Sequence, residues 1–376
     1  MNLNESSLQR VGLSTIRKKI LAGQRLDMAD GEQLFACPDP TLVGQLAHEA
    51  RTLRHGRRTS YVLNQQINYT NICQNRCLFC SYRREPGQDG AFQLSLTDIL
   101  AKVEGAPTSL SEVHIVGGCH PELRLAFFED LLTGIKASRP DVTLKCFTPV
   151  EIAHFARLEG ISAQDVLRRL KRAGLDMLPG GGAEIFAAHV RQRICPAKID
   201  ASEWLAVCAL AHQLEIPTNC TMLFGHLETE ADRLEHLDRL RRQQDETGGF
   251  LCFIPLPFLT SNNQLSGVRG LSGIEELKTI AVSRLMLDNI PHVKSYWVML
   301  GLKQAQAALY FGADDLDGTV VEEKIGHMAG ADSPQVLSQP ELEAMIRGCG
   351  LEPVQRNARF EPVGQKAGPS RDGIEP

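Results

Sequence analysis

Short apolar segments of strand type alternate with amphipathic helices along most of this chain, and this rhythm restricts the folds open to it. Strands are predicted near residues 61–67, 112–116, 142–148, 174–178, 216–223, 250–256, 292–299 and 309–312. Capping pairs three positions apart mark helix starts between them: Ser95 with Asp98, Ser162 with Asp165, Asp200 with Glu203, and Thr229 with Asp232. About eight strand–helix units in roughly 250 residues predict a closed (β/α)8 TIM-type barrel, an α/β fold. An open doubly wound sheet has the same periodicity and is the alternative.

The two ends of the chain depart from this rhythm. Residues 1–58 carry apolar side chains at helical spacing and predict an N-terminal helical extension ahead of a barrel at 59–335. Residues 336–360 predict a short C-terminal extension of helix and strand. Residues 361–376 are rich in proline, glycine and charge without periodicity, which predicts a disordered tail.

Composition excludes several classes of protein. The chain has 40 Lys and Arg against 45 Asp and Glu, a net charge of −5, so nothing in its charge favours nucleic acid or a membrane surface as a partner. No apolar run approaches the roughly 18 residues of a spanning helix. The first residues lack the charged start and apolar core of a signal peptide. We therefore expect a cytoplasmic protein without nucleic-acid or membrane partners.

Three of the eleven cysteines are clustered: Cys73, Cys77 and Cys80. Without a secretory signal they should stay reduced, so the cluster indicates metal binding or catalysis. Thiolates on a loop after a strand are ligands for iron–sulfur clusters and for zinc. A structural zinc site needs four ligands, usually as two pairs, and the sequence has no second CxxC. A four-iron cluster with one open iron position is favoured, and a zinc site completed by a distant histidine is the alternative.

The segment Cys73-Gln-Asn-Arg-Cys77-Leu-Phe79-Cys80 matches the motif CxxxCxΦC, with Φ aromatic, and so the chain resembles the radical S-adenosylmethionine (SAM) enzymes. The resemblance implies a [4Fe–4S] cluster held by the three cysteines, with SAM bound at the open iron and beside Phe79. Electron transfer would then release a 5′-deoxyadenosyl radical from SAM. The resemblance also implies a ferredoxin- or flavodoxin-type electron donor.

Further SAM contacts follow from the same resemblance. Gly117 and Gly118 resemble the glycine motif that receives the SAM amino group, although Cys119 follows here where many members have glutamate. Thr148 and Glu151 follow the third strand, where related enzymes hold the ribose and methionine parts of SAM. For Glu151 the alternative is a place in the first turn of the next helix, which favours an acidic side chain.

Within the superfamily, residues 60–360 are similar to the aminofutalosine synthases. The segments that carry this similarity are GGCHPE (117–122), FTPVEIAHFAR (147–157), ICPAKI (194–199) and RLMLDNIPHVKSYWVMLG (284–301). The similarity implies a transferase of menaquinone biosynthesis that adds the adenosyl radical to the enolpyruvyl double bond of 3-[(1-carboxyvinyl)oxy]benzoate. The products would be 6-amino-6-deoxyfutalosine and bicarbonate, with SAM consumed as a co-substrate.

Two alternatives stay open. Dehypoxanthine futalosine cyclase and FO synthase share much of the pattern, and such enzymes abstract hydrogen instead. A non-enzymatic iron–sulfur or zinc scaffold is the other. A substrate with two carboxylates needs cationic or hydrogen-bonding partners in an otherwise apolar pocket. The candidates at strand ends are His120, Asn219, His226 and Arg284.

Overall fold

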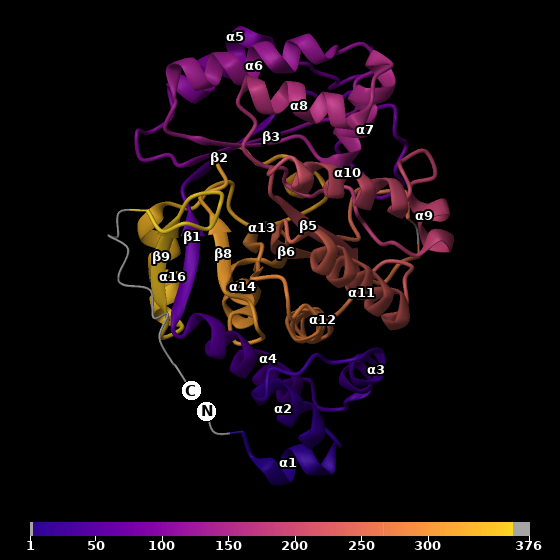
Figure 1. Ribbon diagram of the computed structural model, residues 1–376, viewed down its shortest axis with the longest axis vertical. Helices are drawn as coiled ribbons and strands as arrows, with labels where there is room; N and C mark the ends of the chain where they lie inside the picture. Colours follow the sequence, from indigo (N-terminus) through magenta and orange to yellow (C-terminus); the bar gives the residue numbers. More distant parts are fainter. Residues whose placement is uncertain (1–2, 266, 364–376) are drawn as a thin grey trace.

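The computed structural model describes residues 3–265 and 267–363, and a ring of parallel strands forms its centre (Figure 1). The part of the predicted tail beyond residue 363 lies outside the described residues. The strands are β1 (Arg58–Val62), β2 (Asn64–Asn68), β3 (Glu112–Val116), β4 (Thr143–Cys146), β5 (Thr218–Phe224), β6 (Phe250–Pro257), β7 (His292–Val293), β8 (Asp315–Gly318) and β9 (Glu352–Arg356).

The ring closes through three parallel sheets and the single bridges between them. The sheets have the orders β2-β3-β4, β5-β6-β7 and β8-β1-β9. Isolated parallel bridges join them: Lys145 to Met177, Leu178 to Thr218, and Lys294 to Asp315. Because β1 and β2 follow each other directly, and pair with β8 and β3 respectively, the last strand of the ring returns to the first. The predicted (β/α)8 barrel is therefore confirmed.

Four strand predictions need correction. The single strand predicted at 61–67 is two strands, β1 and β2. Of the range 292–299 only His292–Val293 form β7, since Trp297 already begins the helix Trp297–Leu300. At 174–178 only Met177 and Leu178 pair, each through a single bridge. The strand predicted at 309–312 is wrong, because these residues follow a helix and the eighth strand is β8 at Asp315–Gly318. An apolar pattern could not find β8, since its sequence DLDG is half acidic. Buried cations compensate these acids, as Arg356 donates to Asp315 and Lys294 to Asp317.

Helices cover the outside of the ring (Figure 1). The predicted capping residues are confirmed, since the side chains of Ser95, Ser162, Asp200 and Thr229 each accept a backbone N–H three residues on. No helix among the described residues has an apolar stretch that could cross a bilayer. The helices after the first strands are α5 (Leu96–Glu104), α6 (Leu125–Ser138), α7 (Pro149–Glu159), α8 (Ala163–Ala173), α9 (Ala188–Ile194), α10 (Ala201–Gln213), α11 (Glu230–Thr247), α12 (Gly273–Met286), α13 (Trp297–Leu300), α14 (Leu302–Ala308), α15 (Ile325–Met328) and α16 (Gln339–Gly348).

Four helices precede the ring: α1 (Glu5–Arg10), α2 (Ser14–Leu21), α3 (Met28–Ala36) and α4 (Pro40–His55). Helix α4 packs against α12. Its buried Arg51 donates to the carbonyl of Gly56 at 2.7 Å and to the hydroxyl of Thr59 at 2.7 Å. A third bond reaches the carbonyl of Ala313 at 3.3 Å. This guanidinium therefore ties the N-terminal helices to the starts of β1 and β8.

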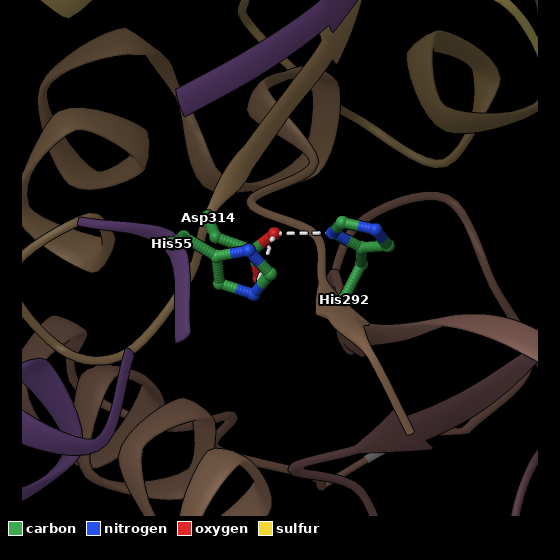
Figure 2. Close-up of side chains that lie close together, drawn as sticks. All are labelled: His55, His292 and Asp314. Carbon is green, nitrogen blue, oxygen red and sulfur yellow. Dashed lines mark hydrogen bonds and ion pairs between the residues drawn. The ribbon is translucent and has the colours of Figure 1, made fainter. Parts of the chain in front are cut away.

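Three potential metal ligands, His55, His292 and Asp314, meet at the amino ends of β1, β7 and β8 (Figure 2). Nδ1 of His292 lies 2.6 Å from Oδ2 of Asp314, and Nε2 of His55 lies 3.5 Å from the same oxygen. The other oxygen of Asp314 accepts the N–H of Val293 at 2.8 Å, and Nε2 of His55 lies 3.1 Å from the carbonyl of Pro291. Protein partners thus already surround these groups, and we interpret them as a hydrogen-bonded cluster at this end of the barrel.

Candidate active site

A cavity of about 340 Å³ lies at the carboxyl ends of the strands, the end at which (β/α)8 barrels place their active sites. All three clustered cysteines, Cys73, Cys77 and Cys80, line it. Their loop follows β2 directly, because the chain leaves the ring at Asn68. The polar groups that the strands and their loops present therefore converge on one space.

Main-chain hydrogen bonds hold the cysteine loop in place. The N–H of Cys73 donates to the carbonyl of Arg84 at 3.2 Å, and Nε of Arg83 donates to the carbonyl of Cys73 at 3.0 Å. The N–H of Leu78 donates to the carbonyl of Ile194 at 2.8 Å. The three thiols are free of disulfides and face the cavity. The loop thus presents three sulfur donors on a fixed backbone.

The pKa values of the three thiols are shifted in different directions by their surroundings. Hydrogen bonds from Cys119 lower the pKa of Cys73 to about 6, and the N–H of Cys119 lies 3.3 Å from its sulfur. Burial raises the pKa of Cys77 to about 12 and also raises that of Cys80, while the ammonium group of Lys198 opposes both shifts. Two of the thiols are therefore protonated at neutral pH, and a bound metal would have to displace those protons.

Two glycines let the next loop pass close to the cysteines. A Cβ at Gly117 would lie 2.7 Å from the ring of Tyr69. A Cβ at Gly118 would overlap the carbonyl oxygen of Ile72 and come within 2.9 Å of Cβ of Cys73. Only glycine fits at these two positions, so the backbone after β3 lies directly against the cysteine loop.

The buried carboxylate of Glu151 fixes this arrangement from α7. Its Oε1 accepts the hydroxyl of Tyr69 at 2.8 Å and the N–H of Gly117 at 3.1 Å. Its Oε2 accepts the N–H of Thr148 at 2.7 Å and the hydroxyl of Thr148 at 2.8 Å. Burial raises the pKa of Glu151 to about 7 against the effect of these bonds. Glu151 lines the cavity, but protein donors already occupy both of its oxygens, as in the capping alternative.

The four predicted substrate contacts are not brought together. Asn219 lines the cavity, whereas His120, His226 and Arg284 are absent from its lining. His226 folds its own turn, with Nε2 3.0 Å from the carbonyl of Leu223. Arg284 lies near the opposite end of the barrel, where it donates to the carbonyls of Pro291 and Ile290 at 3.0 and 2.7 Å.

Several polar side chains that line the cavity belong to the strands themselves and were not among the predicted site residues. The cavity is also lined by Gln66, His114, Lys145, Lys294 and Asp317. Each comes from the body of a strand or from the two residues after β7, and not from a loop. The available signal was a single polar residue inside an apolar strand, as Lys145 is in VTLKCFT. Such a residue points into the barrel when its neighbours point outward.

Two family models match the chain in sequence. "Radical SAM superfamily" covers residues 67–240, and "CofH/MqnC C-terminal region" covers residues 247–367. An aminodeoxyfutalosine synthase of Thermus thermophilus is 44% identical over 93% of this chain and 96% of that protein. The chain belongs to the radical SAM superfamily. It is a radical SAM enzyme, and the cofactors of the superfamily are a [4Fe–4S] cluster and SAM.

Further relatives carry two different names. An aminodeoxyfutalosine synthase of Streptomyces coelicolor is 42% identical over 94% of this chain and 95% of its own length. A 5-amino-6-(D-ribitylamino)uracil–L-tyrosine 4-hydroxyphenyl transferase of Methanopyrus kandleri is 41% identical over 91% of this chain and 93% of its own length. Among solved structures, methylornithine synthase has a TM-score of 0.74 at 16% identity, covering 90% of this chain and 97% of its own. That likeness concerns the radical SAM barrel alone.

The residues at the cavity fit the cofactors of a radical SAM enzyme. Three soft sulfur donors on one loop suit an iron–sulfur cluster and leave one iron without a protein ligand. Gly117 and Gly118 line the same cavity, and their close packing on Tyr69 and Ile72 brings this backbone beside the cysteines. The sulfur donors and the glycine backbone thus border one space.

A protonated histidine supports the far wall of the cavity of this radical SAM enzyme. Nδ1 of His327 lies 3.0 Å from Oε2 of Glu323, and Nε2 lies 3.2 Å from the carbonyls of Ser333 and Pro334. Glu323 lines the cavity and also accepts the N–H of Gly326 at 2.9 Å. The hydrogen bond to Glu323 raises the pKa of His327 to about 9. Acceptors surround both ring nitrogens, which favours the imidazolium form.

The His327→Gln variant is expected to lose stability in a pH-dependent way. Because the pKa of His327 is higher in the folded protein than in the unfolded chain, its contribution is complete below pH 6.5 and is lost as the pH rises through 9. Wild type should exceed the variant by roughly 1–2 kcal/mol in free energy of unfolding at pH 6. Urea unfolding at pH 6 and at pH 10 checks this, and a gap that is equal at both would contradict the charged pair.

Proposed function

We propose that this chain is an aminodeoxyfutalosine synthase, a transferase that joins the 5′-deoxyadenosyl group of SAM to the enolpyruvyl carbon of 3-[(1-carboxyvinyl)oxy]benzoate. The observation that carries the proposal is the match to two relatives of that name at 44% and 42% identity over nearly the full length of both chains. The cavity supports it, since its lining offers cationic groups to a substrate with two carboxylates.

We assign the cluster to Cys73, Cys77 and Cys80, the sulfur donors of the cavity. When bound, the cluster supplies the electron that cleaves the sulfonium bond of SAM. The backbone at Gly117 and Gly118, which lines the cavity beside the cysteines, would receive the amino group of SAM. The barrel walls keep water and other side chains away from the reacting carbon.

The remaining SAM contacts act at the edge of the same space. Phe79 lines the cavity between two of the cysteines and packs against SAM as an apolar surface. Glu151 accepts the N–H of Gly117, and the hydroxyl of Thr148 holds the Glu151 carboxylate in turn, so the two residues position the backbone that would meet SAM. We expect a ferredoxin- or flavodoxin-type protein as the electron donor.

A second candidate function follows from the other group of relatives. The 41% identity to the tyrosine 4-hydroxyphenyl transferase of Methanopyrus kandleri lies close to the values for the aminodeoxyfutalosine synthases. Such an enzyme would act on L-tyrosine and 5-amino-6-(D-ribitylamino)uracil. The two functions therefore differ in substrate, and an assay with both substrate sets separates them.

Anaerobic assays with each substrate set are expected to give an adenosyl-containing product only from the enolpyruvyl benzoate. The protein is reconstituted with iron and sulfide and incubated with SAM and dithionite, and mass spectrometry follows the products. The expected mass is that of 6-amino-6-deoxyfutalosine, and a reaction without dithionite is the control. A 4-hydroxyphenyl product from the uracil and tyrosine mixture would overturn the proposal in favour of the second candidate.

A further inference from the structure

The deep part of the cavity, which we call the floor, is lined by Lys145, His114, Asn219 and Lys294. Lys145 comes from β4, His114 from β3 and Asn219 from β5, while Lys294 directly follows β7. The cysteines, by contrast, are on the loop beyond the end of β2. The cavity thus has a sulfur-lined end at the loops and a polar floor within the ring of strands.

Two buried polar atoms of the floor have no hydrogen-bond partner among the described residues. Nε2 of His114 and Oδ1 of Asn219 are inaccessible to solvent and form no hydrogen bond with any described residue. The ammonium group of Lys145 has three N–H donors, and the hydrogen bond it makes with a described residue goes to Glu112. Lys145 lines the cavity and therefore keeps N–H donors for a ligand there.

The charges of the floor favour an anion beside Lys145. Lys294 is compensated by Asp317 at 2.5 Å and by Asp315 at 3.6 Å, and these carboxylates raise its pKa against the effect of burial. For Lys145 the balance is opposite, since burial lowers its pKa despite Glu112, and Lys294 lowers it further. Burial and the charge of Lys145 also hold the pKa of His114 well below its ordinary value, so its imidazole is neutral.

The shape of the proposed substrate places one carboxylate at this floor. The enolpyruvyl carbon must lie beside SAM, at the sulfur-lined end. The ring carboxylate is meta to the ether oxygen that bears the enolpyruvyl group, so with that carbon beside SAM it can point away from the cysteines. In a barrel closed by strands, the space opposite the cysteines is the floor. Its cationic and hydrogen-bonding groups suit a carboxylate.

We propose that Lys145 and His114 bind the aromatic ring carboxylate of the substrate and so determine the enzyme's specificity for a benzoate. The ammonium of Lys145 and a ring N–H of neutral His114 donate to the two carboxylate oxygens. This inference rests on the proposed function, because it assigns one end of that substrate to one end of the cavity. Residues of the floor act in binding, and the chemistry takes place at the other end.

The test compares two substrates and two variants. The substrates are 3-[(1-carboxyvinyl)oxy]benzoate and its analogue without the ring carboxylate, 2-phenoxyacrylate. Lys145→Met removes the cation, and His114→Phe removes the N–H while leaving the pair of Lys145 with Glu112 intact. Either variant should lower kcat/KM for the benzoate roughly ten- to a hundredfold and change that for the analogue little. Any difference in intrinsic reactivity between the substrates cancels, because it affects wild type and variants alike.

Binding without turnover gives an independent readout. Calorimetry with cluster-loaded protein and SAM, in the absence of dithionite, should show the same ten- to hundredfold rise in Kd for the benzoate only. Lys136→Met is the matched control, since Lys136 pairs with Asp176 at 2.7 Å outside the cavity lining. The Lys136→Met variant should have the wild-type kcat/KM and Kd for both substrates.

The outcomes separate the two proposals. If wild type converts the benzoate and both variants have a lower kcat/KM for the benzoate but not for the analogue, the floor binds the ring carboxylate. The inference is overturned, while the proposed function stands, if wild type converts the benzoate and a folded His114→Phe variant has wild-type kcat/KM for both substrates. An equal fall in kcat/KM for both substrates would overturn it in the same way. If wild type forms no adenosyl product from the benzoate, the proposed function fails, and the inference that rests on it falls with it.

Discussion

Replacing Cys77 by alanine is expected to abolish formation of the adenosyl product and to strip the protein of most of its iron. The three cysteine thiols lie at one end of a single cavity, and a cluster held by three protein ligands has no spare one. Cys77 is the most buried of the three. Iron content, visible absorbance and anaerobic product formation measure the effect.

The matched control is Cys208→Ala. Cys208 is a buried cysteine in α10 that does not line the cavity, so its replacement should leave iron content and product formation near the wild-type level. Circular dichroism should show both variants folded, because each removes only one sulfur atom from a large core. Full iron loading and turnover in Cys77→Ala would rule out the assignment of the cluster to this loop.

Gly118→Ala is expected to lower kcat/KM for SAM about a hundredfold or more. The backbone at Gly118 has no left-handed φ, so alanine fits its conformation, and the effect comes from contact alone. The new methyl group would overlap the carbonyl of Ile72 and press on Cys73. Displacement of the cysteine loop by a fraction of an ångström to 1 Å is enough for such a loss, because the reacting groups must be closely aligned.

Gly348→Ala is the control for this substitution. Gly348 ends α16, also has no left-handed φ, and a Cβ there would meet only the side-chain nitrogen of Gln306 at 3.6 Å, an ordinary contact. Its variant should match wild type in SAM affinity and turnover. SAM binding to the reconstituted proteins and thermal unfolding distinguish a displaced loop from general instability. A folded Gly118→Ala protein with wild-type affinity for SAM would contradict the prediction, because it would show that SAM binding does not require the close contact between Gly118 and the cysteine loop.

Much of the barrel could be predicted because apolar strands and capped helices leave local signals. The strand at 112–116 matches β3, and the helix start at Ser95 has the predicted capping box. One exception is β8, whose acidic residues have no apolar pattern. It forms a strand because Arg356 from β9 and Lys294 beside β7 compensate its carboxylates. Such compensation depends on residues that are distant in the sequence.

In the candidate site, too, the local features could be predicted and the contacts between distant residues could not. A spacing of three and two residues between cysteines is a local property, and the motif predicted a shared site that the cavity lining supports. The substrate contacts were sought at strand ends, and three of the four, His120, His226 and Arg284, lie outside the lining. Arg284 shows why, since a buried guanidinium binds main-chain carbonyls wherever these are within reach.

The strand–helix rhythm, the cysteine motif and the glycines after β3 could be predicted from the chain alone, because each is a pattern among neighbours along it. Which side chains meet inside the barrel depends on the pairing of strands that are far apart in sequence. His114 and Lys145 lie side by side because β3 and β4 pair in parallel with these two residues in register. Closure of the ring then places both at the cavity, where Lys145 keeps N–H donors for a ligand.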